Sequence, residues 1–257
     1  MRLAAQTEGV GPDLVLLHGW GMNSSVWAGF AERLALDYRV TRIDLPGHGR
    51  SPYHGEGQLN AWAEACLDAA PERAVWIGWS LGSMLCLQSA LLAPSRVDGV
   101  VAVAGMPRFV QGKDWQYAMA PKTLDQFIQA LQQDHRQTLE RFLALQMLNS
   151  EHAVEMLRRL KSLLQERPDP LPEALLAGLE LLKRVDLRAQ LGKLTCPTTW
   201  IYGNRDTLAP ARAAPDLHQW LPEATMHIVA GGAHAPFLSH PQETHQLIIS
   251  SLESIHG

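Results

Sequence analysis

The chain has 257 residues, of which 46% are hydrophobic and 19% charged, a balance typical of a globular protein. Its net charge of −4 argues against general binding to nucleic acid or to an anionic membrane. The three cysteines, Cys66, Cys86 and Cys196, are far apart and form no CxxC pair, so neither a disulfide framework nor a zinc site is expected.

The start of the chain lacks the charged and long apolar regions of a signal peptide. No apolar run approaches the roughly 20 residues that span a bilayer. The histidines lack metal-binding spacing, and no glycine-rich nucleotide motif follows a strand. We therefore expect a cytoplasmic monomer that binds no cofactor, no metal, no nucleic acid and no membrane.

Short apolar runs alternate with helical patterns, which is typical of a parallel α/β sheet covered on both faces. The predicted strands are Leu14–Leu17, Arg39–Asp44, Ala74–Gly78, Val97–Ala104, Thr199–Tyr202 and Met226–Val229. A helix is predicted over Gln242–Ile255, because its apolar residues recur at helical spacing.

The stretch from 107 to 188 interrupts this alternation and contains no convincing strand. Its leucines recur at helical spacing around residues 156–164 and 175–182, and prolines at 168, 170 and 172 separate the two patterns. We predict a lid of about four helices, inserted into an α/β core formed by residues 1–106 and 189–257. A separate helical domain is the alternative, but the strand pattern resumes after the insertion.

The strongest chemical signal is Gly78-Trp79-Ser80-Leu81-Gly82, which fits the pattern G-x-S-x-G. A buried strand precedes it and a helical run follows it, and this is the context in which the pattern marks a nucleophilic serine. Glycines permit the sharp turn that lifts the hydroxyl above the sheet. We predict Ser80 as the nucleophile.

A serine hydroxyl needs a base to activate it, and the base needs a group that orients it. In enzymes that carry G-x-S-x-G between a strand of a parallel sheet and a helix, the acid follows the serine along the chain and the histidine follows the acid. Asp206 follows one late strand and His234 follows the next, so both are predicted at the carboxyl edge of the sheet. Asp186 and Asp216 are weaker candidates for the acid, because neither directly follows a strand.

An acyl-transfer site also needs donors for the developing oxyanion. The first predicted strand leads into His18-Gly19-Trp20-Gly21, which matches the H-G-x motif of such sites. We predict the backbone N–H groups of Trp20 and Leu81 as the two donors. His48 lies in the turn Pro46–Gly49 and is predicted to support a loop.

Four segments together resemble the pimeloyl-acyl-carrier protein methyl ester esterases of biotin synthesis, which have the α/β-hydrolase fold. They are His18–Asn23, Asp44–Ser51, Gly78–Gly82 and Gly232–Phe237. The resemblance covers essentially the whole chain, and the segment Leu139–Gln146 makes it more specific. It implies hydrolysis of the methyl ester of a pimeloyl group carried by acyl-carrier protein, with methanol as one product.

The resemblance also implies which residues bind. Substrate would contact Trp20, Ser80, Leu81, Phe142, Leu143, Ala144, Leu145, Gln146 and His234. The carrier protein would contact Arg141, Arg158 and the adjacent Arg159. Gln137 and Val154 stand where some relatives carry arginine. Residues 107–190 hold 12 basic and 11 acidic residues within an acidic protein, so an acidic carrier would be steered toward them.

Two other readings remain open at this point. The same triad serves general carboxylesterases of broad specificity, lipases and thioesterases, so the motifs alone do not choose the substrate. A non-catalytic binding module on a hydrolase scaffold is a second reading, although such proteins usually lose a member of the triad and all three are present here. Dehalogenase and epoxide-hydrolase readings are weaker, because those enzymes use aspartate as the nucleophile.

Overall fold

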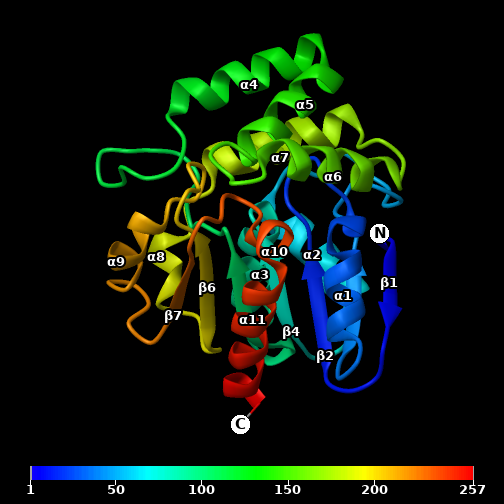
Figure 1. Cartoon of the computed structure of the whole chain (residues 1–257), viewed down its shortest axis with the longest axis vertical. Coiled ribbons are helices and arrows are strands. Elements are labelled where there is room, and N and C mark those ends of the chain that lie inside the picture. Colours follow the sequence, from blue (N-terminus) through cyan, green and yellow to red (C-terminus); the bar gives the residue numbers. More distant parts are fainter. Residues whose placement is uncertain (1, 257) are drawn as a thin grey trace.

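Seven strands form one sheet in the order β1-β3-β2-β4-β5-β6-β7 in the computed structural model, which describes residues 2–256 (Figure 1). β1 runs antiparallel to β3, and all other neighbours are parallel. The strands are β1 Ala5–Glu8, β2 Asp13–Leu17, β3 Arg39–Ile43, β4 Ala74–Trp79, β5 Val97–Val103, β6 Thr198–Gly203 and β7 Thr225–Val229. The mostly parallel sheet that the apolar runs predicted is confirmed.

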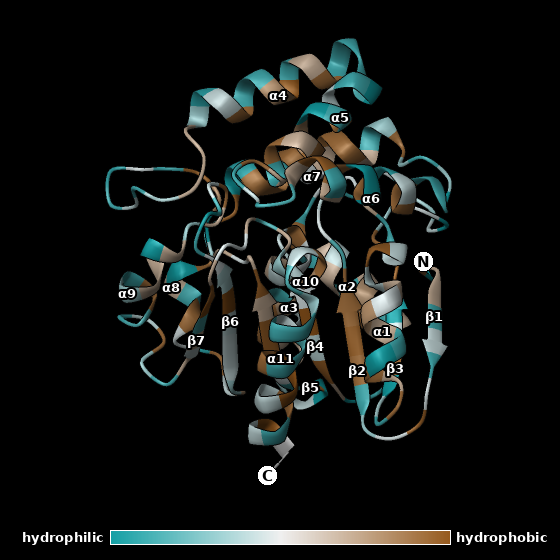
Figure 2. Cartoon of the chain, in the orientation of Figure 1, coloured by the Kyte–Doolittle hydropathy of each residue, from teal (hydrophilic) through white to brown (hydrophobic). Residues whose placement is uncertain are grey.

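The central strands are buried on both faces. Every residue of β4 and of β6 is buried, as parallel strands covered by helices require. Figure 2 shows β2 in the colour of hydrophobic residues. β1 was not predicted, because it is a four-residue edge strand whose side chains are largely exposed and polar.

Helices cover both faces of this sheet. α1 and α11 lie on one face, where the rings of Phe30 and His245 are 5.5 Å apart, and α2 packs against α3 on the other (Figure 1). The α-helices are α1 Ala28–Leu34, α2 Leu59–Ala69, α3 Leu81–Leu92, α4 Pro121–Gln133, α5 His135–Gln146, α6 Ala153–Gln165, α7 Pro172–Arg184, α8 Arg188–Leu191, α9 Ala214–Leu217, α10 Pro236–Ser239 and α11 Pro241–His256. The 3₁₀ helices are η1 Ser24–Trp27, η2 Pro94–Arg96 and η3 Ala211–Ala213.

Helices α4 to α7 form a layer beyond the carboxyl ends of the parallel strands (Figure 1). α6 shows why they fold there: Met156, Leu160 and Leu164 recur on one side and are buried, while Arg158 and Arg159 face solvent. These four helices come from a single stretch between β5 and β6. Among the residues that the structure describes, no helix is both long enough and apolar enough to cross a bilayer.

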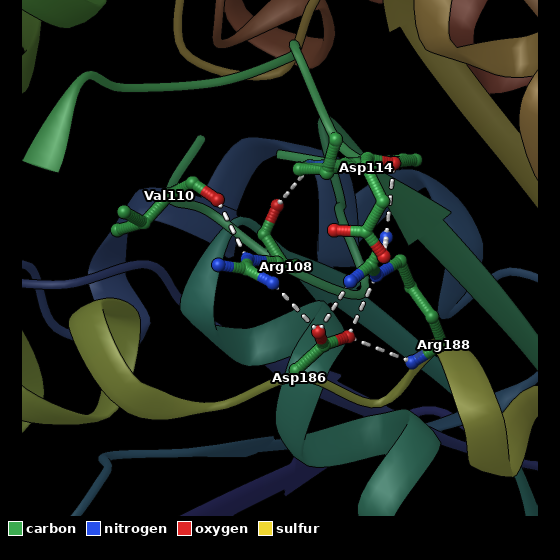
Figure 3. Close-up of polar contacts among 6 residues, drawn as sticks. Arg108, Val110, Asp114, Asp186 and Arg188 are labelled. Carbon is green, nitrogen blue, oxygen red and sulfur yellow. Dashed lines mark hydrogen bonds and ion pairs between the residues drawn. The ribbon is translucent and has the colours of Figure 1, made fainter. Parts of the chain in front are cut away.

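The two ends of this stretch are joined by a cluster of ion pairs (Figure 3). Arg108 and Arg188 both bind the carboxylate of Asp186, at 2.9 and 2.7 Å, and Arg188 also contacts Asp114 at 3.0 Å. The guanidinium of Arg188 lies 5.4 and 5.6 Å from the ring centres of Trp115 and Trp220. The chain therefore enters and leaves the helical layer at one fixed point.

The charge of Asp186 depends on these arginines. Burial alone would raise the pKa of its carboxyl, but hydrogen bonds from Arg188 and attraction to it hold that pKa below the usual value. A carboxylate with a lowered pKa stabilises the fold above its unfolded pKa. That contribution is lost as the pH falls through the lowered value.

Replacing Arg188 should therefore destabilise the protein. Arg188→Ala removes several charge-assisted hydrogen bonds from a side chain that is 9% exposed, and we expect a loss of about 2 kcal/mol in the free energy of unfolding. Urea unfolding measures this loss. Arg184→Ala is the matched control, because that side chain is 76% exposed and pairs with Glu180 on the surface of the same helix, and it should cost about 0.5 kcal/mol or less. Equal losses in the two variants would contradict the prediction.

Candidate active site

Ser80 lies in a sharp turn between β4 and α3. Its φ of 56° is in the left-handed region, which is strained for a residue with a side chain. Gly82 makes the turn possible, because a Cβ at that position would lie 2.5 Å from the carbonyl oxygen of Leu17. The backbone N–H of Ser80 donates to the carbonyl of Val103 on the neighbouring strand, which anchors the turn at 3.0 Å.

His234 and Asp206 meet Ser80 at this edge of the sheet. The Nε2 atom of His234 is 2.9 Å from the hydroxyl oxygen of Ser80, and its Nδ1 is 2.8 Å from Oδ2 of Asp206. The other carboxylate oxygen, Oδ1, accepts from the backbone N–H groups of Leu208 and Ala209 at 2.8 and 3.0 Å. Side chains separated by up to 154 residues thus form one hydrogen-bonded line.

Backbone and tryptophan contacts fix the loop of His234. The indole N–H of Trp79, next to Ser80, donates to the carbonyl of His234 at 2.7 Å. The backbone N–H of Arg205 donates to the carbonyl of Gly232 at 2.9 Å, which holds the Asp206 loop against the His234 loop. The distances between Ser80, His234 and Asp206 are therefore fixed by contacts among the end of β4, the loop after β6 and the loop after β7, and not by the three side chains alone.

The two N–H groups predicted to face an oxyanion are free. Trp20 and Leu81 are both fully buried, and the hydrogen bonds of residues 2–256 give neither backbone N–H a partner. Buried backbone donors without a partner are rare, and they suit a site in which a ligand supplies the acceptor. Leu81 is also the first residue of α3, where the helix dipole favours negative charge.

The helical layer contacts this site directly. The indole N–H of Trp20 donates to the carbonyl of Leu175 on α7 at 2.8 Å, and its ring lies 4.6 Å from that of Phe142 on α5. The backbone N–H of His234 donates to the carbonyl of Gln146 at 3.3 Å. Ser80 is only 4% exposed, so the structure shows the site in a closed form.

The segment 142–146, predicted to bind substrate, forms the end of α5, and its residues differ in exposure. Phe142, Leu143 and Gln146 are buried, Leu145 is half-buried, and Ala144 is exposed. The side-chain oxygen of Gln146 is buried without a hydrogen-bond partner. Phe142 contacts the ring of Trp20, and the carbonyl of Gln146 accepts from the N–H of His234, so these two members of the segment lie against the loops of the candidate site.

A cavity of about 300 Å³ lies in the helical layer, between α5, α6 and the start of α7. Leu139, Leu143, Leu164 and Leu175 form its apolar wall, and charged residues including Lys161 form its rim. Ser80 and His234 are not among its lining residues. Leu175 joins the two sites, because its carbonyl holds Trp20.

The three arginines predicted to contact a carrier protein are exposed. Arg141 lies on α5, and Arg158 and Arg159 lie on α6. Within the part of the chain that the structure describes, none of them has an acidic side chain at ion-pair distance. Arg159 lies toward the core, because it lines a small cavity together with residues of η1 and α1.

The remaining candidates from the sequence lie elsewhere. Asp216 accepts a hydrogen bond from the hydroxyl of Tyr117 at 2.9 Å, and Asp186 belongs to the cluster of Figure 3. The reasoning from sequence missed the indole of Trp79 as a support for His234. Its position inside G-x-S-x-G offered a signal, since that residue necessarily lies beside the nucleophile.

The contact between α7 and Trp20 yields a testable expectation. Gly178 lies against the indole, and a Cβ there would be 2.6 Å from Cδ1 of Trp20. Gly178→Ala should gain about 1 kcal/mol of helix propensity but displace Trp20, so we expect kcat to fall roughly tenfold or more while the fold persists. Steady-state kinetics with a p-nitrophenyl ester, alongside urea unfolding, would test this. Gly57→Ala, where a Cβ meets open space, should leave kcat unchanged.

Known proteins resemble this chain over almost its entire length. A family described as the alpha/beta hydrolase fold matches residues 12–241. The chain is 46% identical to a pimeloyl-acyl-carrier protein methyl ester esterase of Photobacterium profundum, covering 94% of each chain. It is 45% identical to one of Pectobacterium atrosepticum, covering 95% of this chain and 96% of the relative.

Solved structures agree on the fold. An esterase from Exiguobacterium antarcticum superposes with a TM-score of 0.88 at 22% identity, covering 98% of this chain and 95% of that one. A hydrolase from Pseudomonas aeruginosa PA01 gives a TM-score of 0.78 at 26% identity, covering 97% and 94%. The curated relatives show that the chain belongs to the pimeloyl-acyl-carrier protein methyl ester esterases, a family of the α/β-hydrolase fold.

Proposed function

We propose that this chain hydrolyses the methyl ester of pimeloyl-acyl-carrier protein, releasing methanol and leaving a free pimeloyl carboxylate on the carrier. The observation that carries the proposal is the buried line from Ser80 through His234 to Asp206, at 2.9 and 2.8 Å, beside two unpartnered N–H groups. The names of the close relatives supply the substrate, and the geometry supports the chemistry.

Each side chain has one role in the proposed reaction. The Ser80 oxygen bonds to the ester carbonyl carbon while Nε2 of His234 accepts the hydroxyl proton. The Trp20 and Leu81 N–H groups stabilise the resulting oxyanion. His234 returns the proton to the departing methoxide, which leaves as methanol, and the acyl group remains on Ser80. A water molecule, deprotonated by His234, then bonds to the acyl carbon; the bond from that carbon to the Ser80 oxygen breaks, His234 returns the proton to this oxygen, and the acid is released.

Asp206 orients His234 throughout this sequence. It accepts from Nδ1–H, which leaves Nε2 free to take the serine proton and stabilises the imidazolium that forms. Every bond change uses Ser80, His234 and water, so the proposal includes no cofactor and no metal. It is a proposal for one copy of the chain acting in the cytoplasm, without a membrane or nucleic acid.

The helical layer would supply specificity. We assign residues 107–188 the role of a lid over the core formed by residues 1–106 and 189–257. The apolar wall of the lid cavity suits an acyl chain, and Phe142 and Gln146 lie toward the catalytic loops. Arg141, Arg158 and Arg159 are free to bind the acidic surface of a carrier protein.

A comparison of two esters tests the proposal. We expect kcat/KM for the carrier-bound pimeloyl methyl ester to exceed that for free monomethyl pimelate by at least about tenfold, equivalent to roughly 1.4 kcal/mol. Added salt should reduce the advantage, because it screens the attraction between arginines and carrier. Growth of a biotin auxotroph lacking this step, rescued by the chain and not by its Ser80→Ala variant, would support the same conclusion in cells.

The alternatives predict other outcomes. Equal rates on the two esters would replace the proposal with a carboxylesterase of broad specificity. Release of the pimeloyl group from the carrier, in place of methanol, would indicate a thioesterase. A fluorophosphonate probe that leaves Ser80 unlabelled would indicate a non-catalytic binding module.

A further inference from the structure

Two buried histidines flank Trp20, and the proposed reaction gives neither of them a chemical step. His18 precedes the turn Gly19–Gly21, and His48 approaches it from the loop after β3. Both are fully buried, and their rings lie 5.4 Å apart. A polar ring in such a place usually has a structural reason to be there.

The hydrogen bonds of His18 fix its tautomer. The backbone N–H of Leu45 donates to Nε2 of His18 at 2.9 Å, so that nitrogen carries no proton. The neutral ring then carries its proton on Nδ1, which donates to the carbonyl oxygen of Gly19 at 2.8 Å. Burial lowers the pKa of His18, which keeps the ring neutral, although the charge of Asp44 opposes this shift.

The carbonyl of Gly19 belongs to the peptide whose N–H is that of Trp20. The peptide is trans, so its C=O and N–H point in opposite directions. Because His18, and at 3.3 Å the N–H of Met22, bind the carbonyl on one side, the Trp20 N–H is directed to the other side. Gly19 lies against the nucleophile: a Cβ on it would be 3.3 Å from Cβ of Ser80.

We propose that His18 is a positioning residue, whose Nδ1–H sets the orientation of the Gly19–Trp20 peptide and thereby holds the Trp20 N–H at the oxyanion site. This inference rests on the proposed function, since it assumes that the Trp20 N–H stabilises an oxyanion. His48 secures the far end of the same turn, because its Nε2 accepts from the N–H of Gly21 at 3.3 Å while its Nδ1–H donates to Pro46. The carboxylate of Asp44 holds the residues that follow this turn, because it accepts from the N–H of Ser24 at 2.7 Å.

Two conservative variants separate the two hydrogen bonds of the ring. The amide nitrogen of asparagine occupies roughly the place of Nδ1, so His18→Asn keeps the donor to Gly19 and loses the acceptor for Leu45. Glutamine reaches the place of Nε2, so His18→Gln keeps the acceptor and loses the donor. Each variant loses one bond, which makes each the control for the other in urea unfolding.

We expect His18→Asn to retain kcat for a p-nitrophenyl ester within about threefold. His18→Gln should lose roughly 10²-fold in kcat, the effect of one oxyanion donor, with KM little changed. Equal kcat values in the two variants, or a loss that follows the urea midpoint, would overturn the inference. A purely structural role moves stability and leaves no such difference in kcat.

A measurement on the unmodified protein is independent of how the variants fold. Nitrogen NMR of His18 should show a neutral ring protonated on Nδ1, and protonation on Nε2 would contradict the proposal. Ser80→Ala in the same ester assay distinguishes the two possible failures. If turnover needs Ser80 but the His18 variants behave alike, only the positioning role is lost; if turnover does not need Ser80, the proposed function itself is wrong.

Discussion

Ser80→Ala should reduce kcat for a short p-nitrophenyl ester by about 10⁶-fold. The hydroxyl is the only part of the side chain that the proposed reaction uses, and alanine leaves His234 and Asp206 in place without a nucleophile. The residual rate should be the small catalysis that an oxyanion site supplies to water. Assays run over long times would measure the residual rate, and the absence of labelling by a fluorophosphonate probe would show that no unmodified protein contaminates the variant.

Ser89→Ala is the control for that experiment. Ser89 lies on the same helix, α3, and is also buried, but its hydroxyl has no hydrogen-bond partner in the described structure. Its removal should leave kcat unchanged and cost little or no stability. Turnover by the Ser80 variant within tenfold of the unmodified protein would overturn the assignment of the nucleophile.

Asp206→Asn should lower kcat by about 10⁴-fold, and the structure shows why. One oxygen of Asp206 accepts from the N–H groups of Leu208 and Ala209, and an asparagine would keep its oxygen there. Its NH₂ group would then face Nδ1 of His234, which forces the proton to Nε2. A protonated Nε2 cannot accept the proton of Ser80.

The matched variant is Asp216→Asn, at the other late acidic position weighed from the sequence. Asp216 is bonded to the hydroxyl of Tyr117, outside the catalytic line, so kcat should not change. The two variants would be compared by kcat at fixed pH, with urea unfolding as a check on folding. A comparable loss of kcat in both would show that Asp206 has no special relation to His234.

Much of the fold follows from local patterns in the sequence. Continuous apolar runs mark parallel strands because those strands are covered on both faces, and the parallel sheet matches them. β1 escaped notice because an exposed edge strand needs no apolar run. The stretch that holds α4 to α7 was predicted to be a lid of about four helices; its role as a lid stays a prediction, since its contacts with the core depend on tertiary packing.

The hydrogen-bonded line from Ser80 to Asp206 was easier to predict than its surroundings. Ser80, Asp206 and His234 each follow a strand, and parallel strands end at the same edge, so their proximity is built into the topology. The indole bonds of Trp20 and Trp79 join residues 155 positions apart, and no spacing rule announces them. Asp186 looked like a weak candidate acid, but it holds the ends of the helical layer together.

Trp20 contacts both sides of the candidate site: its indole N–H donates to the carbonyl of Leu175, and its backbone N–H is the proposed oxyanion donor. Ser80 is 4% exposed and Leu175 lies on α7, so a displacement of α7 would break this hydrogen bond. The position of Trp20, whose backbone N–H is proposed to face the oxyanion, is therefore coupled through one hydrogen bond to the position of a helix that comes from the stretch between β5 and β6.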